Sequence, residues 1–296
     1  MSSRLRAIAA ANEEIAATGG YRTEDGTRVE VRAALDAAVR GTHCYLPDEP
    51  LIVPPADARR DAAARTGTPL VEVTAEGSLQ AARRLCARGG ADGTGPAAGV
   101  AVLNFASARN PGGGYLGGAK AQEEDLCRQS LLLSCLLSAP EYYAAHRAED
   151  DLLYSDRVIW SPRVPVHRGD DGRLVARPQA VSFLTCPAPN AGEVLRRDPA
   201  AGSRIGDTLR RRAGRVLAVA AHHGVRQLVL GAWGCGVFRN NPHEVAAAFD
   251  AHLGPDGAYR DAFDTVAFAV WDRSARSANR DAFTARFGTP QGHGRP

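Results

Sequence analysis

Apolar positions along the chain follow the two periods that are typical of strands and of helices. From residue 69 onward, short runs rich in Val, Leu and Phe alternate with longer stretches in which apolar residues recur every three or four positions. The short runs predict strands over 69–74, 99–107, 157–161, 180–186, 226–233 and 263–271. The longer stretches predict helices over 78–90, 126–137, 204–223, 243–253 and 279–287. This alternation indicates an α/β fold, layered around a mixed and mainly buried sheet.

The first part of the chain has a different pattern. Residues 3–18 predict an amphipathic helix that ends at a glycine pair. Residues 21–32 predict a hairpin with an Asp-Gly turn, and a short helix follows near 33–39. Residues 47–68 are rich in Pro, Ala, Arg and Asp and predict an irregular connection.

These patterns divide the chain into three parts. Residues 1–68 form an N-terminal extension of helix and hairpin, which we expect to pack on the core. Residues 69–288 form the core domain, and residues 289–296 are expected to be a disordered tail.

Composition and charge narrow the class of protein. The chain has 296 residues, of which 44% are hydrophobic, and a formal net charge of +3. A charge this small gives no support for nucleic-acid binding, although it suits an anion held in a local site. No apolar run approaches the length of a membrane span. Six cysteines occur without a C-x-x-C pair, so we expect reduced thiols, no metal site and a cytoplasmic protein.

Two glycine-rich loops directly follow apolar strands. The first lies in NFASARNPGGGYLGGAKAQEE, residues 104–124, and the second in GAWGCGVFRNNP, residues 231–242. Ligands of α/β sheets bind beyond the carboxyl ends of strands, and backbone N–H groups at glycine turns favour anions such as a diphosphate. Neither loop has the spacing of a P-loop, and the first loop also lacks the spacing of a dinucleotide fingerprint. Tight turns without a ligand are the alternative interpretation.

Two adjacent glutamates, Glu123 and Glu124, follow the first loop. Acidic residues in a first helical turn are favoured by the helix dipole, which is the purely structural interpretation. Neighbouring helical side chains point about 100° apart, so the pair cannot flank one bond as the usual glycosidase carboxylates do. We therefore expect one carboxylate to do chemistry and the other to bind or orient.

The order Gly-Gly-Gly, seven residues, Gln-Glu-Glu resembles the signature of poly(ADP-ribose) glycohydrolases, and its surroundings resemble the bacterial form. The second loop resembles the diphosphate loop of that family, and the N-terminal helix and hairpin resemble its bacterial extension. The resemblance covers nearly all of residues 3–287. It implies a macrodomain-like α/β/α sandwich with a mixed central sheet that binds ADP-ribose.

The resemblance also implies roles for residues of the first loop. Glu124 matches the catalytic acid, and Glu123 matches the glutamate that holds the ribose beside the scissile bond. Gln122 completes the signature and supports the loop. The glycines that would wrap the diphosphate and distal ribose are Gly112, Gly113 and Gly114. We expect burial and neighbouring negative charge to raise the pKa of Glu124.

The remaining ligand contacts implied by the resemblance fall in the second loop and before the first. The second loop supplies Gly234, Cys235, Gly236, Val237, Phe238 and Asn240. Phe238 resembles the aromatic side chain that packs on the distal ribose. An asparagine of many macrodomains is replaced by Ser107, which leaves Asn104 and Asn110 as alternative candidates to orient that ribose.

The sequence thus predicts an enzyme that hydrolyses ribose–ribose bonds of poly(ADP-ribose), mainly from chain ends, and releases ADP-ribose. Its partners are the polymer or ADP-ribosylated protein, with no cofactor, no metal, no membrane and no specific nucleic acid. The alternatives are a hydrolase of mono-ADP-ribose and a macrodomain that binds ADP-ribose without turnover. An acid at Glu124 argues against the last of these, because binding alone does not need one.

Overall fold

The computed structural model describes residues 2–53, 69–88, 99–274 and 276–288. Seven strands form one sheet in the order β3-β6-β7-β5-β8-β9-β4. Their bounds are β3 (His43–Tyr45), β4 (Leu70–Thr74), β5 (Val100–Phe105), β6 (Val158–Arg168), β7 (Leu174–Cys186), β8 (Gln227–Leu230) and β9 (Thr265–Ala269). The pairs β3–β6 and β6–β7 are antiparallel, and the pairs from β7 to β4 are parallel, so the sheet is mixed as predicted.

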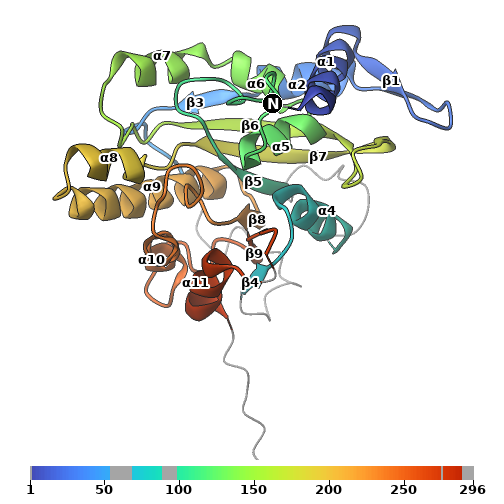
Figure 1. The fold of residues 1–296 in the computed structure, drawn as a ribbon. Helices are drawn as coiled ribbons and strands as arrows, with labels where there is room; N and C mark the ends of the chain where they lie inside the picture. The colour runs from blue at the N-terminus through green and yellow to red at the C-terminus, as the bar shows by residue number, and fades with distance from the viewer. Residues whose placement is uncertain (1, 54–68, 89–98, 275, 289–296) are drawn as a thin grey trace, which may run out of the picture.

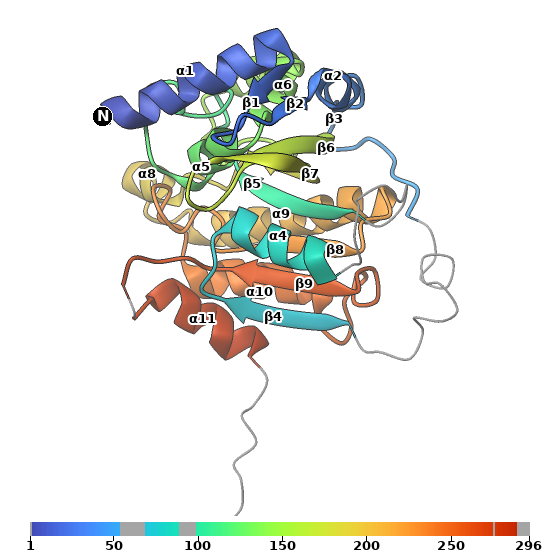
Figure 2. The same cartoon turned by 90° about the vertical axis from the view of Figure 1, so that its right-hand side faces the viewer.

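Helices cover both faces of the sheet (Figures 1 and 2). One face carries α8 (Ala191–Arg197), α9 (Gly202–His222), α10 (Pro242–Leu253) and α11 (Ala278–Phe287). The other carries α1 (Ser3–Thr18), α2 (Arg32–Arg40), α4 (Ser78–Arg88), α5 (Gln122–Gln129), α6 (Leu132–Leu137) and α7 (Pro140–Ala148). Figure 2 shows α4 in front of the sheet with α9 and α10 behind it. The predicted α/β/α sandwich is confirmed.

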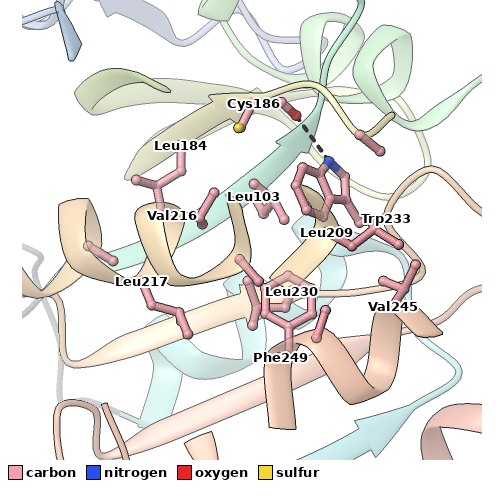
Figure 3. Close-up of a cluster of buried hydrophobic side chains, with 14 of the residues drawn as sticks. Leu103, Leu184, Cys186, Leu209, Val216, Leu217, Leu230, Trp233, Val245 and Phe249 are labelled. Carbon is pink, nitrogen blue, oxygen red and sulfur yellow. Dashed lines mark hydrogen bonds between the residues drawn. The ribbon is translucent and has the colours of Figure 1, made fainter. Parts of the chain in front are cut away.

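The central strand β5 explains why two layers of helices are needed. Successive side chains of a strand point to opposite faces, and those of β5 are apolar on both. Val100 and Val102 belong to the core beneath α4, whereas Ala101 and Leu103 belong to the core beneath α9. Figure 3 shows the core beneath α9, where Leu103 lies among side chains of the neighbouring strands and of the helices α9 and α10.

The N-terminal segment contains the predicted helix α1 and a two-stranded hairpin of β1 (Gly20–Arg22) and β2 (Arg28–Glu30). The sequence did not predict β3, whose three residues lie within this segment and pair with β6 at the edge of the central sheet. A division of the chain near residue 68 stays a prediction. The predicted tail at 289–296 and most of the predicted connection at 47–68 lie outside the described residues.

The predicted single helix over 126–137 is wrong in one respect. The structure has two helices, because the backbone at Ser130 is extended with φ −134° and ψ 172°. Ser130 there forms a bridge with Val166, and the N–H of Leu131 donates to the carbonyl of Pro165. Pairing with β6 therefore interrupts a segment whose apolar residues alone favour a continuous helix.

The prediction missed other elements. The strands predicted at 157–161 and 180–186 are parts of the long β6–β7 hairpin, and α7 and α8 were not predicted. No helix among the described residues combines the length and the apolar character needed to cross a lipid bilayer.

Candidate active site

Two loops meet at one edge of the sheet. The first, residues 106–121, follows β5, and the second, residues 231–241, follows β8. Because β5 and β8 are parallel neighbours, with Val102 opposite Val229, their carboxyl ends lie side by side. The glycine-rich loops are therefore adjacent, as the sequence predicted.

Gly113 is the point at which the first loop approaches the glutamate pair. Its φ is +56°, in the left-handed region that favours glycine, and Gly112 beside it has φ +68°. A Cβ atom on Gly113 would lie 2.6 Å from Oε1 of Glu124 and 3.1 Å from Oε2 of Glu123. Both carboxylates thus converge on the same bare stretch of backbone, although they leave the helix in different directions.

Glu124 is 7% exposed, and its two carboxylate oxygens have different surroundings. Oε1 accepts a hydrogen bond of 2.8 Å from the N–H of Gly114. Oε2 is buried and has no hydrogen-bond partner among the described residues. One oxygen is therefore fixed by the loop while the other is available to a ligand, because buried acceptors normally have a partner.

Glu123 is 3% exposed, and both of its oxygens are occupied. Oε2 accepts from the N–H of Ser107 at 2.7 Å, and Oε1 accepts from the side-chain amide of Asn104 at 3.2 Å. Burial raises the pKa of Glu123 to about 8, and the charge of Glu124 adds to that effect, although both hydrogen bonds oppose it. The surroundings of Glu123 therefore favour its protonated form.

The two candidate asparagines have different positions. Asn104, on β5, is fully buried and donates to Glu123 and, at 3.1 Å, to Oγ1 of Thr185. Its Oδ1 has no partner among the described residues. Asn110 is exposed, and its backbone closes a turn with Gly113 and with the hydroxyl of Ser107. Only Asn104 contacts the glutamate pair, and its role toward a ribose stays a prediction.

Gln122 joins the start of α5 to the end of β5. Its Oε1 accepts from the N–H of Phe105 at 2.9 Å, and its Nε2 donates to the carbonyl of Leu103 at 2.9 Å. The same amide also donates to the hydroxyl of Ser78 at 3.0 Å. These bonds set the position at which the glutamates leave the helix, consistent with the supporting role expected for this side chain.

In the second loop, the side chain of Asn240 packs against Gly234 and binds its backbone. Gly234 has φ +71°, and a Cβ atom there would lie 2.5 Å from Nδ2 of Asn240. That amide nitrogen donates to the carbonyls of Pro189 at 2.8 Å and of Gly234 at 3.1 Å. Asn240 is buried, so in this structure its side-chain donors support the loop from beneath.

The tip of the second loop faces outward. Gly236 is exposed, Val237 is 81% exposed, and Phe238 is half-buried against the core. The backbone N–H groups of these three residues have no hydrogen-bond partner within the described part of the chain. Burial raises the pKa of the Cys235 thiol to about 12, which favours a packing role for Cys235 over a nucleophilic one.

Sequence reasoning missed several residues around the second loop. Tyr154 and Arg239 have φ values of +60° and +56°, which are uncommon outside glycine and often occur at functional sites. The ring of Tyr154 lies 6.1 Å from that of Phe238, centroid to centroid. No pattern in the sequence marks either residue, because their conformations depend on distant contacts.

One arginine of α9, Arg212, is buried in the protein rather than exposed to solvent. Its guanidinium is fully buried and donates to Asp156 at 2.8 Å and to the carbonyls of Leu153, Tyr154 and Pro187 at 2.7 to 3.0 Å. Its four acceptors lie in residues 153–156 and at Pro187, two segments that only the fold brings together around α9.

Tyr115, Tyr142 and Tyr143 are buried in the core that also contains Val100 and Val102 of β5. The hydroxyl of Tyr115 donates to the carbonyl of Ala9 at 3.4 Å and so ties the first loop to α1. In the described ranges no group of His, Cys, Asp and Glu side chains is arranged to hold a metal ion.

A family model and several solved structures are similar to this chain. A family model described as microbial-type PARG, catalytic domain, matches residues 9–169. The crystal structure of poly(ADP-ribose) glycohydrolase (PARG) from Thermomonospora curvata is 44% identical, with a TM-score of 0.86 over 97% of this chain and 100% of that chain. Its structure bound to the inhibitor ADP-HPD gives a TM-score of 0.85 with the same identity and coverage.

A second relative is more distant in shape. The PARG of Deinococcus radiodurans in complex with ADP-ribose is 41% identical, with a TM-score of 0.73, and the match covers 87% of this chain and 98% of that chain. A comparison with curated protein sequences gave no match. The matches to these solved structures cover 87% to 97% of this chain and nearly all of theirs.

Proposed function

The chain belongs to the family of microbial-type poly(ADP-ribose) glycohydrolases and is a glycoside hydrolase acting on poly(ADP-ribose), and we propose that Glu124 is its general acid. The observation that carries the proposal is the free Oε2 of Glu124, a buried carboxylate oxygen without a partner among the described residues. The N–H of Gly114 in the first loop holds Oε1 of the same carboxylate, so Oε2 is the oxygen left to bind a ligand.

The reaction follows from the chemistry of the bond. The bond joins the anomeric carbon of one ribose to a hydroxyl oxygen of the next unit, and it breaks through an oxocarbenium-like transition state. Glu124 in its protonated form gives its proton to the leaving oxygen as the carbon–oxygen bond breaks. The resulting carboxylate then takes a proton from the water that attacks the anomeric carbon. Glu124 ends the cycle protonated again.

Glu123 and Asn104 are assigned to the ribose. Their mutual hydrogen bond and the bond from the N–H of Ser107 fix the carboxylate of Glu123 next to that of Glu124. A ribose hydroxyl bound to this pair would keep the anomeric carbon within reach of the acid. Such positioning supplies a large share of the rate in reactions of this type.

The diphosphate is assigned to the tip of the second loop. Successive N–H groups at Gly236, Val237 and Phe238 have no protein acceptor in the described residues, and converging N–H groups bind anions. Gly112 and Gly113 bring the backbone of the first loop to the other side of the ligand. Phe238 supplies an apolar surface for the distal ribose between the two loops.

The enzyme releases ADP-ribose mainly from the ends of the polymer. A terminal unit can enter between the two loops without threading further polymer through them. The cytoplasmic location and action on ADP-ribosylated protein stay predictions from the sequence. Hydrolysis of mono-ADP-ribose from proteins would use the same acid and differs only in the leaving group.

The test compares wild type with Glu124→Gln on automodified poly(ADP-ribosyl)ated protein. Wild type should shorten the polymer and release ADP-ribose, whereas the variant should bind ADP-ribose in calorimetry without turnover. Near-normal turnover by the variant would remove Glu124 from the mechanism. The length of the products distinguishes cleavage at chain ends from cleavage within the chain. Early appearance of long oligomers would contradict release from chain ends.

A further inference from the structure

A cleft lies against α1, beside the end of the first loop. It consists of two adjoining cavities of about 320 Å³ and about 620 Å³, between α1, the start of α5 and the turn that joins β6 to β7. The two cavities share Arg4, Ile8 and Arg168, and Lys120 lines the smaller one. None of these residues belongs to the candidate active site.

The charge that this cleft presents is positive. Each of its lining carboxylates has an arginine partner: Asp125 pairs with Arg128 at 3.6 Å, Asp171 and Glu24 share Arg173 at 3.8 Å and 3.6 Å, and Asp170 pairs with Arg83 of α4. Arg4 and Lys120 are exposed and make no ion pair or hydrogen bond with any described residue. Two unneutralised cations therefore face the cavity.

One thickness of backbone separates the cleft from the catalytic carboxylate. Gly114, whose N–H binds Glu124, has its α-carbon so near Ala119 that a Cβ atom would lie 2.8 Å from the methyl group. The carbonyl of Ala119 accepts from Arg128 on the cleft side at 2.6 Å, and Lys120 follows directly. A polymer that extends from the catalytic carboxylate to the cleft thus needs to pass only this one segment of loop backbone.

The loop is also packed on α1. A Cβ atom on Gly118, whose φ is +79°, would lie 2.9 Å from the carbonyl oxygen of Ser2. The beginning of α1 and its Arg4 therefore sit against the same loop that binds Glu124. The N-terminal helix is in this way part of the wall that a substrate meets beyond the acid.

We propose that this cleft binds the polymer unit next to the scissile bond, with Arg4 and Lys120 at its diphosphate. The inference rests on the proposed function: the oxygen that Glu124 protonates belongs to that unit, so the rest of the polymer leaves the site on the side of Glu124. Each unit carries an anionic diphosphate, which complements the free charges. The cleft holds the chain while its terminal unit is cut, and a single ADP-ribose does not reach it.

The test measures binding as well as turnover. In a Glu124→Gln background, fluorescence anisotropy with polymers of defined length gives Kd for a long chain, and calorimetry gives Kd for ADP-ribose. Arg4→Ala/Lys120→Ala should weaken binding of the long chain several-fold and leave the affinity for ADP-ribose unchanged. The slope of log Kd against log salt should fall by about 1.4, at about 0.7 for each lost phosphate contact on a single-stranded polyanion.

The matched control is Arg40→Ala/Arg210→Ala, which removes two exposed cations of α2 and α9 outside the cleft. Equal loss in both double variants would mean a general charge effect and would overturn the proposal, as would unchanged binding of the long chain. Lys120 is the only lysine in the sequence, so acetylation of wild type compared with acetylation of Lys120→Arg, in which only the terminal amine reacts, provides a second measurement with the same expected result. Failure of wild type to release ADP-ribose would instead count against the proposed function, because the binding measurement does not need turnover.

Discussion

Replacing Gly113 with alanine should greatly lower the catalytic rate of the enzyme and only slightly lower its free energy of unfolding. The added methyl group would lie 2.6 Å from Oε1 of Glu124, whereas ordinary van der Waals contact begins at 3.4 Å. The carboxylate is the movable partner, since it is the end of a side chain, so it must shift by roughly 1 Å. A misplacement of about 1 Å at a catalytic group can lower the rate about 100-fold, and we expect kcat to fall by that order.

The cost in stability is separable from this effect. An alanine at φ +56° costs about 1–2 kcal/mol through backbone strain alone. Gly26, in the hairpin turn, provides the control because its φ is +86° and a Cβ atom there would meet nothing within 4 Å. Gly26→Ala should therefore lose a similar free energy of unfolding and keep full activity.

The assay is release of ADP-ribose at saturating polymer for both variants, alongside urea unfolding and calorimetric binding of ADP-ribose. The reasoning predicts similar free energies of unfolding and a large difference in kcat. If Gly113→Ala kept kcat within about threefold of Gly26→Ala, the loop would not be holding Glu124 in a fixed position, and our account of the first loop would be wrong.

Two further predictions concern the neighbours of the acid. Because burial raises the folded-state pKa of Glu123 from 4.5 to about 8, the folded protein retains a proton that the unfolded chain has released between those values, so wild-type stability should decline as pH rises through that window. Glu123→Gln should flatten this decline in urea unfolding at pH 5 and pH 8, and an unchanged slope would contradict the assignment. Asn12 is buried in α1 and donates to the carbonyls of Cys127 and Arg128 in α5, while its Oδ1 accepts from His167. Asn12→Leu should lower the free energy of unfolding by about 2–4 kcal/mol, since it leaves buried polar groups unpaired, and a loss under 1 kcal/mol would show that water replaces the amide.

The strands and the two loops could be predicted because their signals are local. Strands buried on both faces are continuous apolar runs, as in β5, β8 and β9. Glycine clusters directly after such runs mark positions where backbone must come close to something else. The Gln-Glu-Glu motif is equally local, because Gln122 bonds back to the strand that it follows.

The rest depended on contacts between distant parts of the chain. Arg212 looks like a surface residue of an arginine-rich helix until the fold brings four acceptors around it. Ser130 interrupts an apolar helix because β6 offers a pairing partner there. Tyr154 and Arg239 adopt left-handed backbone conformations that their own side chains do not favour. Periodicity cannot report such features, since each depends on a residue far away in sequence.

The glutamate pair illustrates how two adjacent residues of one type acquire different chemistry. The helix dipole would favour both carboxylates equally, but α5 begins with Glu123 directed at β5 and Glu124 directed at the glycine loop. Glu123 meets two donors and deep burial, which fix its position and raise its pKa. Glu124 meets one donor and keeps an unpartnered oxygen. The different surroundings of the two carboxylates therefore come from the rotation of α5 about its axis, which the hydrogen bonds of Gln122 and Asn12 hold at its two ends.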